Sequence, residues 1–511
     1  MAEDKAQSAN QTIAYFESLN IPQLKLVINA EGQQQLRDSP REYARCSLVE
    51  NETLVSKSIG VKLKGAAGSY RDFDDRPGLT LNIAKYKKNE RFHGMQKFHL
   101  NNAVQDESLL SEWIGSEVFR AAGVEVPRVA HVRLWINDRD MGIYILREGF
   151  DHPFLKRAFD DHDGNLYDGG FVQDIDSELE MDNGLDSDNR TDLVGLAAAC
   201  FHPTPAIRWS AIAERMDIDK FITFMALERI CCHWDGYTLN TNNYRIYFPQ
   251  HGKGVFLPHG MDQIFGDPTA GVYDHSSSLL AAAVMQNNEW FRKYREQIKN
   301  LLPILQPIEQ WTDKIDGQWR RLKPALESLD AGLAQNHSDR IAELKERFIQ
   351  RVEALPNLID SSLPMPIDFD ASGTARLNDW YPSEEAEEIK LEEVELAGVK
   401  CYSITRERFG DFTSSWRHRI LLPKGKYRFA ARIKTEEVIP IPEEQGRGAG
   451  IRRSQAGRCD EIVGTSDWTT VIYVIEVPED QRDVELVLEL RARHGTAWFD
   501  RQSLKIRRIS D

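Results

Sequence analysis

Short runs of alternating apolar and polar residues dominate the first 150 positions of the chain, a pattern typical of β-strands with one buried face. The runs that predict strands are 59–63, 79–83, 97–100, 129–136 and 141–146. The loop between the first two strands carries Gly65 and Gly68, and residues 137–139 (Asn-Asp-Arg) mark a tight turn between the last two. Residues 1–40 read as a short lead-in with one strand-like run at 24–29.

Between the third and fourth of these strands the apolar residues recur at helical spacing instead. They are Leu109, Leu110, Trp113, Val118 and Phe119. Asp106 is the expected N-cap of this helix, and Gly123 is its expected end. The resulting order is strand, glycine-bearing loop, strand, strand, helix, strand, strand. This is the layout of a kinase-type N-lobe, and many α+β folds share it.

The middle of the chain is first acidic and then helical. Residues 151–200 read as a loop whose acidic members are Asp174, Asp176, Glu178, Glu180, Asp182, Asp186 and Asp188. The stretch lacks the ligand order and central glycine of an EF-hand, so we expect a solvated loop rather than a calcium site. Apolar spacing predicts helices at 218–232 and across 278–358. A helical second half behind a β-rich first half suits a two-lobed enzyme.

The sequence pattern changes near residues 355–367, where Pro356, Pro364 and Pro366 interrupt the chain. This change predicts a second domain. Beyond it, alternating runs predict strands at 427–433, 469–477, 484–490 and 497–501. This is the pattern of a β-sandwich or jelly roll. The predicted fold class is therefore α+β. A two-lobed, protein-kinase-like domain is expected over 41–362, with lobes at about 41–150 and 151–362, and an all-β domain over 370–511.

Composition narrows the function classes. The 511 residues carry a formal charge of −16, which argues against a nucleic-acid partner because phosphate binding needs a basic face. No run of 18 or more apolar residues predicts a membrane span. Six cysteines without a C-x-x-C pair argue against zinc. The first residues lack the features of a signal peptide, so a cytoplasmic location and export by a leader outside this sequence both stay open.

The candidate chemistry lies in two loops around a predicted strand pair, 244–248 and 254–257. Asp235 and Asn240 before the pair have the D-x-x-x-x-N spacing of the protein-kinase catalytic loop, and Asp262 follows the pair. Phosphoryl transfer needs a carboxylate that orients the attacking hydroxyl and accepts its proton. It also needs amide and carboxylate oxygens that hold magnesium beside the phosphates.

The same residues have a structural interpretation, since the D-x-x-x-x-N spacing also arises by chance. Asp235 would then form a turn, Asn243 would cap a helix, and His233 would be a satisfied interior histidine. The density of polar loop residues around one strand pair favours the chemical interpretation, because a hairpin gathers residues before and after it around one point.

These loops resemble the motifs of the spore-coat CotH kinases, a family similar to protein kinases in fold. The chain reads WDGYTLNTNNYRIY at 234–247, where the family has W-D-G-Y-x-x-N-x-N-N-Y-x-x-Y. It reads PHGMDQIFG at 258–266, where the family has P-x-x-x-D-x-x-F-G. The similarity covers roughly 40–360, and the two loop motifs are its specific part.

The resemblance implies Asp235 as the catalytic aspartate and Asp262 as a magnesium ligand, with Asn240 or Asn243 assisting. The implied cofactors are ATP and Mg²⁺, with Mn²⁺ as an alternative ion. The implied partner is a protein substrate with a Ser or Thr acceptor, and the implied location is secreted or extracytoplasmic.

The chain departs from the family where a phosphate-binding cation is expected. The family has a paired-lysine segment resembling P-K-K-S after the glycine-bearing loop, and this chain has Asp-Arg-Pro-Gly at 75–78. The cation would then be Lys62, Lys64 or Arg76, although the two lysines also read as solvated residues of a strand. Glu148 is a candidate ion-pair partner of that cation or a contact near the adenine.

The C-terminal domain resembles carbohydrate-binding jelly rolls, because residues 422–427 (LPKGKY) are like their L-P-x-G-x-Y strand start. The resemblance implies a glycan or cell-surface contact through exposed aromatic residues. Trp468 and Trp498 also fit core positions, and the domain equally fits a docking or spacer role.

Two functions follow from these patterns. The first is a Mg-ATP-dependent phosphotransferase, a protein Ser/Thr kinase of the CotH type. The second is a non-catalytic coat, surface-assembly or adhesion protein that keeps the fold. The presence of Asp235, Asn240 and Asp262 together favours the enzyme, while the altered lysine segment keeps the alternative open.

Overall fold

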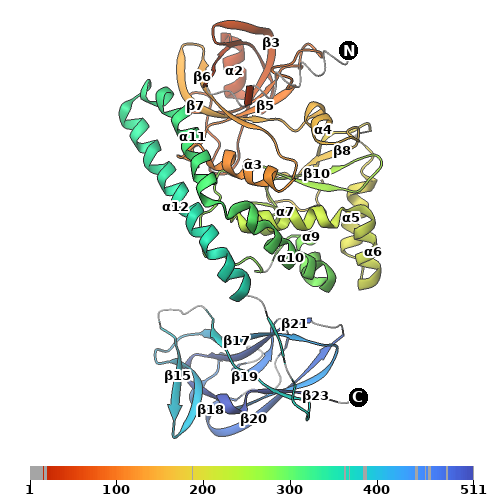
Figure 1. The fold of residues 1–511 in the computed structure, drawn as a ribbon, viewed down its shortest axis with the longest axis vertical. Helices are drawn as coiled ribbons and strands as arrows, with labels where there is room; N and C mark the ends of the chain where they lie inside the picture. Colours follow the sequence, from red (N-terminus) through yellow and green to blue (C-terminus); the bar gives the residue numbers. More distant parts are fainter. Residues whose placement is uncertain are drawn as a thin grey trace. The chain divides into compact units, whose positions relative to one another are not determined.

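The computed structural model describes residues 15–16, 20–186, 188–274, 276–361, 364–367, 369–383, 388–442, 447–454, 456–457, 462–478 and 482–509. The chain divides into two compact units, Met1–Ser361 and Ser362–Asp511, which are described separately (Figure 1). The described α-helices all lie in the first unit. The fold class is therefore α+β with an all-β C-terminal region, as the strand and helix patterns predict.

The first unit begins with a closed barrel of seven strands in the order β1-β2-β3-β4-β5-β7-β6. The strands are β1 (Gln23–Val27), β2 (Ala44–Glu50), β3 (Thr53–Lys64), β4 (Gly78–Asn82), β5 (Lys97–Asn101), β6 (Val129–Ile136) and β7 (Arg139–Glu148). Neighbouring strands are antiparallel except β1 and β6, which close the barrel in parallel. Alternate side chains such as Ile59, Val61 and Leu63 are buried, as the alternating pattern predicts.

Residues 1–40 were predicted to be a lead-in outside the domain, and this prediction is wrong for the residues that the structure describes there. β1 belongs to the barrel, because it pairs with both β2 and β6 and closes the sheet on itself. It is followed by helix α2 (Ala30–Asp38), which Asn29 caps by accepting a hydrogen bond from the Gly32 N–H. A strand-like run shows that a strand can form there, but gives no sign of a partner as distant in sequence as β6.

Helix α3 (Ser111–Ala121) lies between β5 and β6 and begins at Ser111 rather than directly after Asp106. The preceding residues form a compact turn in which Leu109 has a left-handed φ of 65°. The Asp106 carboxylate accepts hydrogen bonds from the N–H groups of Ser108 at 3.1 Å and Ser111 at 2.8 Å. Asp106 therefore satisfies a free N–H at the helix start as a cap does, but from outside the N-cap position.

The predicted loop over residues 151–200 is wrong, because four regular elements lie in it. They are α4 (His152–Ala158), β8 (Asn165–Asp168), β9 (Glu180–Asn183) and α5 (Thr191–Cys200). Elements this short show little periodicity in the sequence. With β10 (Tyr244–Phe248) and β11 (Val255–Pro258), the two strands form a sheet of order β11-β10-β8-β9. The solvated-loop interpretation also fails for Asp182, which forms ion pairs with Lys97 and Arg245.

Helices make up the rest of the first unit. They are α6 (Pro205–Arg215), α7 (Ile218–Ile230), α8 (Tyr237–Asn240), α9 (Leu279–Gln286), α10 (Asn288–Leu305), α11 (Ile308–Glu327) and α12 (Ala331–Ser361). Helix α7 is buried on nearly every side because it packs against both α10 and β11 (Figure 1). It ends directly before the loop that carries Asp235. The comparison of this barrel and helical region with kinase lobes stays a prediction.

The second unit consists of two sheets around a core of its own. The first sheet contains β12 (Met365–Pro366), β14 (Tyr381–Pro382), β17 (Phe412–Leu422), β19 (Gly448–Arg453) and β21 (Arg482–Ala492). The second contains β13 (Thr374–Arg376), β15 (Lys390–Leu396), β16 (Val399–Arg406), β18 (Gly425–Ile439), β20 (Gly464–Val477), β22 (His494–Asp500) and β23 (Lys505–Ile509). Trp468 and Trp498 are partly exposed, so neither is a core residue.

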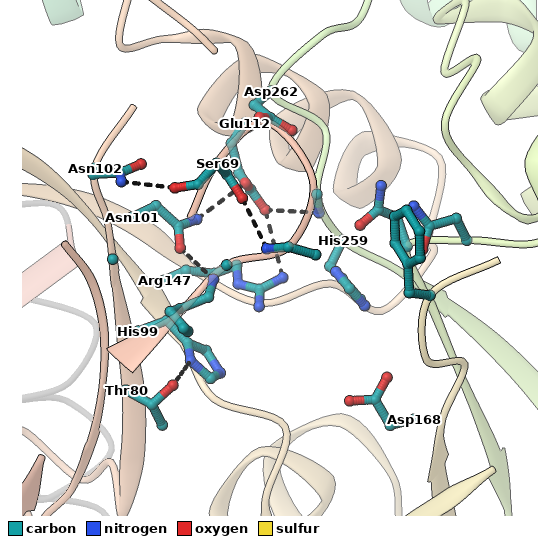
Figure 2. A pocket seen from close by; sticks show the side chains of 18 of the residues that line it. Ser69, Thr80, His99, Asn101, Asn102, Glu112, Arg147, Asp168, His259 and Asp262 are labelled. Carbon is teal, nitrogen blue, oxygen red and sulfur yellow. Dashed lines mark hydrogen bonds and ion pairs between the residues drawn. The ribbon is translucent and has the colours of Figure 1, made fainter. Parts of the chain in front are cut away.

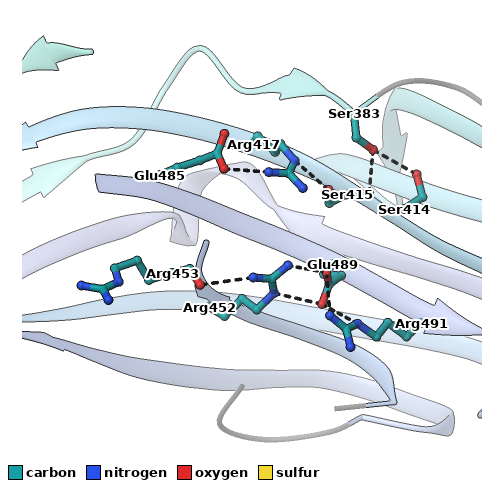
Figure 3. Close-up of polar contacts among 9 residues, drawn as sticks. All are labelled: Ser383, Ser414, Ser415, Arg417, Arg452, Arg453, Glu485, Glu489 and Arg491. Atoms are coloured by element: carbon teal, nitrogen blue, oxygen red, sulfur yellow. Dashed lines mark hydrogen bonds and ion pairs between the residues drawn. The ribbon is translucent and has the colours of Figure 1, made fainter. Parts of the chain in front are cut away.

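A buried carboxylate on β21 is held by two arginines (Figure 3). Glu489 is 1% exposed and accepts hydrogen bonds from Arg452 Nη2 at 2.8 Å and Arg491 Nε at 3.0 Å. Removing a carboxylate from water is costly, and pairing both of its oxygens offsets that cost. The charges on this strand are thus part of the packing of the sandwich.

Candidate functional site

The polar residues predicted to act together line one pocket of about 720 Å³ in the first unit (Figure 2). Barrel strands form one wall, and the loops around β10 and β11 form the other. The predicted site residues that line it are Lys62, Lys64, Asp235, Asn240, Asn243 and Asp262.

Asp235 is held in place by the two asparagines of the same loop. Asn240 Nδ2 donates to Asp235 Oδ1 at 2.6 Å, and Asn243 Nδ2 donates to Asp235 Oδ2 at 2.8 Å and to its backbone oxygen at 2.9 Å. Hydrogen bonds to an ionised acceptor are strong and fix its orientation. Because each amide donates through nitrogen, its oxygen remains available, and an amide oxygen is an atom that binds magnesium.

Glu228, in the last turn of α7, holds the loop that carries Asp235. Glu228 is 1% exposed and accepts hydrogen bonds from the N–H groups of Tyr237 at 2.9 Å and Thr238 at 2.8 Å, and from the Thr238 hydroxyl. A carboxylate in this position caps the short helix α8. The sequence analysis did not single out Glu228, because nothing in a helical run marks which residue faces the next loop.

His233 joins this loop to the second one. Its Nε2 lies 3.2 Å from the Gly260 carbonyl oxygen, and its Nδ1 lies 3.5 Å from Glu228 Oε1. Burial by itself lowers the pKa of His233, but the nearby carboxylate of Glu228 outweighs burial, and the pKa is raised above its usual value. His233 is therefore an interior histidine, as the structural interpretation held, with a positioning role between the two loops.

Asp262 follows β11 in the second loop and lies in the same pocket. Burial, together with the negative charge of Glu112, raises the pKa of Asp262 to about 7. Glu112, on α3, accepts a hydrogen bond from the Gly260 N–H at 3.1 Å and so holds this loop. A carboxylate whose charge is disfavoured by its surroundings gains stability when a cation binds beside it.

The two predicted lysines lie on β3. Lys64 Nζ donates to Asn101 Oδ1 at 2.5 Å, and burial lowers the pKa of Lys64 to about 7. Lys62 Nζ lies 5.0 Å from the centre of the Tyr43 ring. Lys64 is thus a half-buried residue at the wall of the pocket, held by Asn101, rather than a solvated residue of a strand face, and a bound anion would favour its charged form.

Arg76 and Glu148, the other predicted contacts of a nucleotide, do not line the pocket. Arg76 donates to the backbone oxygens of Asn102 at 2.9 Å and Ile143 at 2.7 Å, so it joins strands and loops of the barrel. Glu148 pairs with Arg128 at 2.5 Å, outside the pocket. Their proposed roles beside the phosphates and the adenine therefore have no support from their positions.

The pocket also contains charged residues that the sequence analysis missed (Figure 2). Arg147 Nη1 lies 3.7 Å from Glu112 Oε1, and the buried Arg147 Nε has no hydrogen-bond partner among the described residues. Arg147 directly precedes Glu148 on β7, and neighbouring residues of a strand point to opposite faces. Arg147 therefore lines the pocket and Glu148 does not. The strand prediction did not reveal this, because it did not specify which face of β7 lines a pocket.

A second missed group lies around Arg245. Its guanidinium pairs with Asp168 at 2.6 Å and Asp182 at 3.0 Å, and it donates to His259 Nε2 at 2.8 Å. Burial and nearby cations hold the pKa of His259 well below its usual value, so His259 is neutral and accepts this hydrogen bond. These residues line the pocket, and the charge of Arg245 is already paired with the two aspartates.

The residues of the pocket fit a magnesium ion and a phosphate-bearing ligand. Asp235 and Asp262 supply carboxylates and Asn240 and Asn243 supply amides, and magnesium prefers such oxygen ligands. Lys64 and Arg147 supply positive charge, and the free Nε of Arg147 is a donor without a partner among the described residues. The oxygen ligands therefore suit a bound cation, and the basic side chains suit a bound anion beside it.

The barrel and the loops around β10 and β11 enclose a pocket lined by carboxylates, amides, Lys64 and Arg147. This lining is that of a site for a metal ion and an anionic ligand. The family model described as CotH kinase protein matches residues 61–361, which is more than half of the chain. The chain therefore belongs to the CotH kinase protein family.

Similar proteins have names that refer to coats and to invasion. Inner spore coat protein H of Bacillus subtilis (strain 168) is 21% identical over 333 residues, which cover 60% of this chain and 88% of that protein. Invasin CotH2 of Rhizopus delemar is 26% identical over 266 residues, 45% of this chain and 44% of that protein. Spore coat protein homolog 1 of the same fungus is 26% identical over 184 residues, 33% of this chain and 30% of that protein. The match thus spans less than half of either fungal protein.

Among solved structures, TmCBM61 in complex with β-1,4-galactotriose matches with a TM-score of 0.20 and 12% identity, covering 26% of this chain and 91% of that one. A structure described as "CBM4 structure and function" matches with a TM-score of 0.18 and 19% identity, covering 24% and 78%. Similarity at these TM-scores does not define a shared fold, and no binding property follows from it.

Proposed function

We propose that the protein is a Mg-ATP-dependent phosphotransferase that phosphorylates Ser or Thr side chains of a protein substrate. The observation that carries the proposal is the position of Asp235. Its carboxylate is fixed by Asn240 and Asn243 in the same pocket as Asp262 and Lys64. Such a set of fixed oxygens and basic side chains is what phosphoryl transfer needs, because its catalysis rests on positioning and charge.

Each residue has a distinct role in the proposed reaction. Asp235 orients the acceptor hydroxyl and takes its proton while the hydroxyl oxygen bonds to the γ-phosphorus and the bond from that phosphorus to the β,γ-bridging oxygen breaks, releasing ADP. Lys64 and Arg147 offset the charge of the phosphates. Asp262 and an asparagine oxygen would hold magnesium, which when bound neutralises charge on the phosphates.

The altered lysine segment does not remove the cation that this chemistry needs. The Arg76 side chain is used within the barrel, so it does not replace the family's lysines. Arg147, which is buried, and Lys64, which is half-buried, already line the pocket and can offset the charge of the phosphates. This supports the enzyme over a protein that only keeps the fold.

A second candidate is a coat, surface-assembly or adhesion protein, and the printed names of the relatives favour it. Those names also support a coat or cell-surface location. Among the residues that the structure describes, no helix is both long enough and apolar enough to cross a membrane. The all-β unit would serve either function by docking to a surface or a glycan.

The test is transfer of labelled γ-phosphate from ATP to the protein itself or to generic acidic and basic acceptors, with magnesium or manganese. Asp235→Asn is expected to slow transfer by about 10²-fold or more, the usual scale for a positioned base, while ATP affinity stays nearly unchanged. Asp313→Asn, an exposed residue of α11, is the matched control.

The outcomes separate the two candidates. If the wild type transfers no phosphate with either ion, the assembly function replaces the enzyme. If the wild type is active and Asp235→Asn is equally active, the enzyme stands but Asp235 is not its base. A rise in melting temperature with magnesium and ATP together would show that the folded protein binds them.

A further inference from the structure

Three potential metal ligands lie together outside the pocket, in the segment that leads from the barrel to the four-stranded sheet. Among the residues that the structure describes, His152, His162 and Asp163 are the one group of His, Cys, Asp and Glu side chains with three ligand atoms within 4.8 Å of one another. His152 is the first residue of α4, and the other two lie in the loop between α4 and β8 (Figure 1).

The distances suit a tetrahedral ion. His152 Nε2 lies 3.2 Å from Asp163 Oδ1, a hydrogen bond that a metal would replace when Nε2 loses its proton. Two ligands at about 2.0–2.1 Å from a tetrahedral centre lie about 3.3–3.4 Å apart, so this pair is already at coordination distance. The remaining ligand atoms are within 4.8 Å, so small side-chain rotations complete the set.

The hydrogen bonding of His162 leaves one ring nitrogen available to a metal. Its Nδ1 lies 3.0 Å from the backbone oxygen of Asp160, to which it donates. The proton then sits on Nδ1, and the lone pair of Nε2 is available to a metal. Histidines that bind metals commonly donate their other N–H to a carbonyl or carboxylate in this way, which fixes the tautomer and the ring.

The loop is held in shape by contacts that do not involve the three ligands. The Tyr247 hydroxyl donates to the Asp161 backbone oxygen at 2.8 Å and accepts from the Gly164 N–H at 3.1 Å. The Asp161 carboxylate accepts from the His251 N–H at 2.6 Å. Both sides of the His162–Asp163 pair are therefore fixed to β10 and to the turn after it, so binding a metal orders little additional chain.

We propose that His152, His162 and Asp163 form a binding site for a divalent transition metal of the zinc class, with water as the fourth ligand. Two imidazoles and one carboxylate are the ligands that such ions prefer, whereas magnesium and calcium prefer oxygen alone. The side chains of His152 and Asp163 are 46% and 54% exposed, so an ion has direct access. The cysteine spacing gave no sign of this site because no cysteine takes part.

The site ties together the segment between the two parts of the first unit. Bound metal joins the start of α4, just after β7, to the loop that leads into β8. β8 ends at Asp168, which pairs with Arg245 at the floor of the candidate active pocket. The bound ion would thus hold together the segment that connects β7, which carries Arg147, to the sheet that carries Arg245. This site is independent of whether the pocket transfers phosphate.

The test uses the full chain without an affinity tag, first stripped with a chelator and then titrated with Co²⁺ or Zn²⁺ in excess magnesium. We expect one Co²⁺ per chain with the visible absorption of tetrahedral coordination, and Zn²⁺ should displace it. His162→Gln, His152→Gln and Asp163→Asn should each weaken binding by about 10-fold or more, since even residues behind the ligands are worth 10- to 100-fold. His202→Gln, a partly buried histidine elsewhere on the first unit, should leave binding unchanged.

Circular dichroism and the melting temperature in chelator show whether each variant is folded, so lost binding is not mistaken for unfolding. Equal Co²⁺ binding by the wild type and a variant with all three changes would overturn the proposal. So would an octahedral spectrum, or binding that excess magnesium removes, because each places the ion on oxygen ligands elsewhere.

Discussion

Asn240 donates a hydrogen bond to the carboxylate of Asp235 across 2.6 Å. The spacing D-x-x-x-x-N therefore brings its two polar ends into contact, because the short helix α8 begins after Gly236 and ends at Asn240. An asparagine that donates to the aspartate keeps its oxygen available for a metal, so the pair links the proposed base to the proposed magnesium site.

Glu228→Gln is expected to destabilise the first unit by about 1–3 kcal/mol, because an amide –NH₂ would replace an oxygen that accepts a buried N–H of the Asp235 loop. Denaturant unfolding measures the change. Glu296→Gln, at an exposed position of α10, is the matched control. Equal stability of the two variants would mean that the loop does not depend on this carboxylate.

Asp262→Ala is expected to abolish magnesium-dependent nucleotide binding, because the variant lacks the carboxylate proposed to hold magnesium beside the phosphates. Titration calorimetry with ATP, with and without magnesium, measures the affinity. Affinity equal to that of the wild type in magnesium would remove Asp262 from the site.

Asp262→Asn is expected to stabilise the metal-free and nucleotide-free protein at about pH 8 and not at about pH 4. The pKa of Asp262 is raised to about 7 in the folded state, so the folded chain binds more protons than the unfolded chain between its usual pKa near 4 and 7. Its contribution to stability is full below about pH 4 and is lost as the pH rises through 7.

Asparagine carries no charge to bury, so the gain at high pH should be on the order of 1–4 kcal/mol. Melting temperatures across the pH series in chelator measure it, with Asp313→Asn as the control. A gain of the same size at about pH 4 would point to packing instead of charge.

A fragment ending at residue 361 is expected to unfold cooperatively and to keep nucleotide binding. The chain divides into compact units at this point, and the described residues of the second unit's apolar core begin at Ile367. Calorimetric unfolding of the fragment and its ATP affinity in magnesium measure both properties. An insoluble fragment would show that the first unit needs the second to fold.

Local pattern was sufficient for many elements of the barrel. The alternation over 129–136 predicted β6 at its exact bounds, and the turn at 137–139 predicted the hairpin to β7. Helix α3 was predicted, but not its start, because the Asp106 turn imitates a cap. These signals succeed because each depends on residues a few positions apart.

The sequence by itself was enough to identify the loop motifs around Asp235 and Asp262. It also showed the change from helical to strand periodicity that separates the C-terminal domain. Only the tertiary structure decided which distant residues complete the site. Glu112 comes from α3 and Arg147 from β7, and the pairings from β3 through β4 and β5 to β7 bring Arg147 to the same pocket as Lys64, one of the candidate cations of the sequence. Periodicity specifies which face of a strand is buried, but not which strand lies beside it, so residues contributed across the barrel could not be assigned from the pattern.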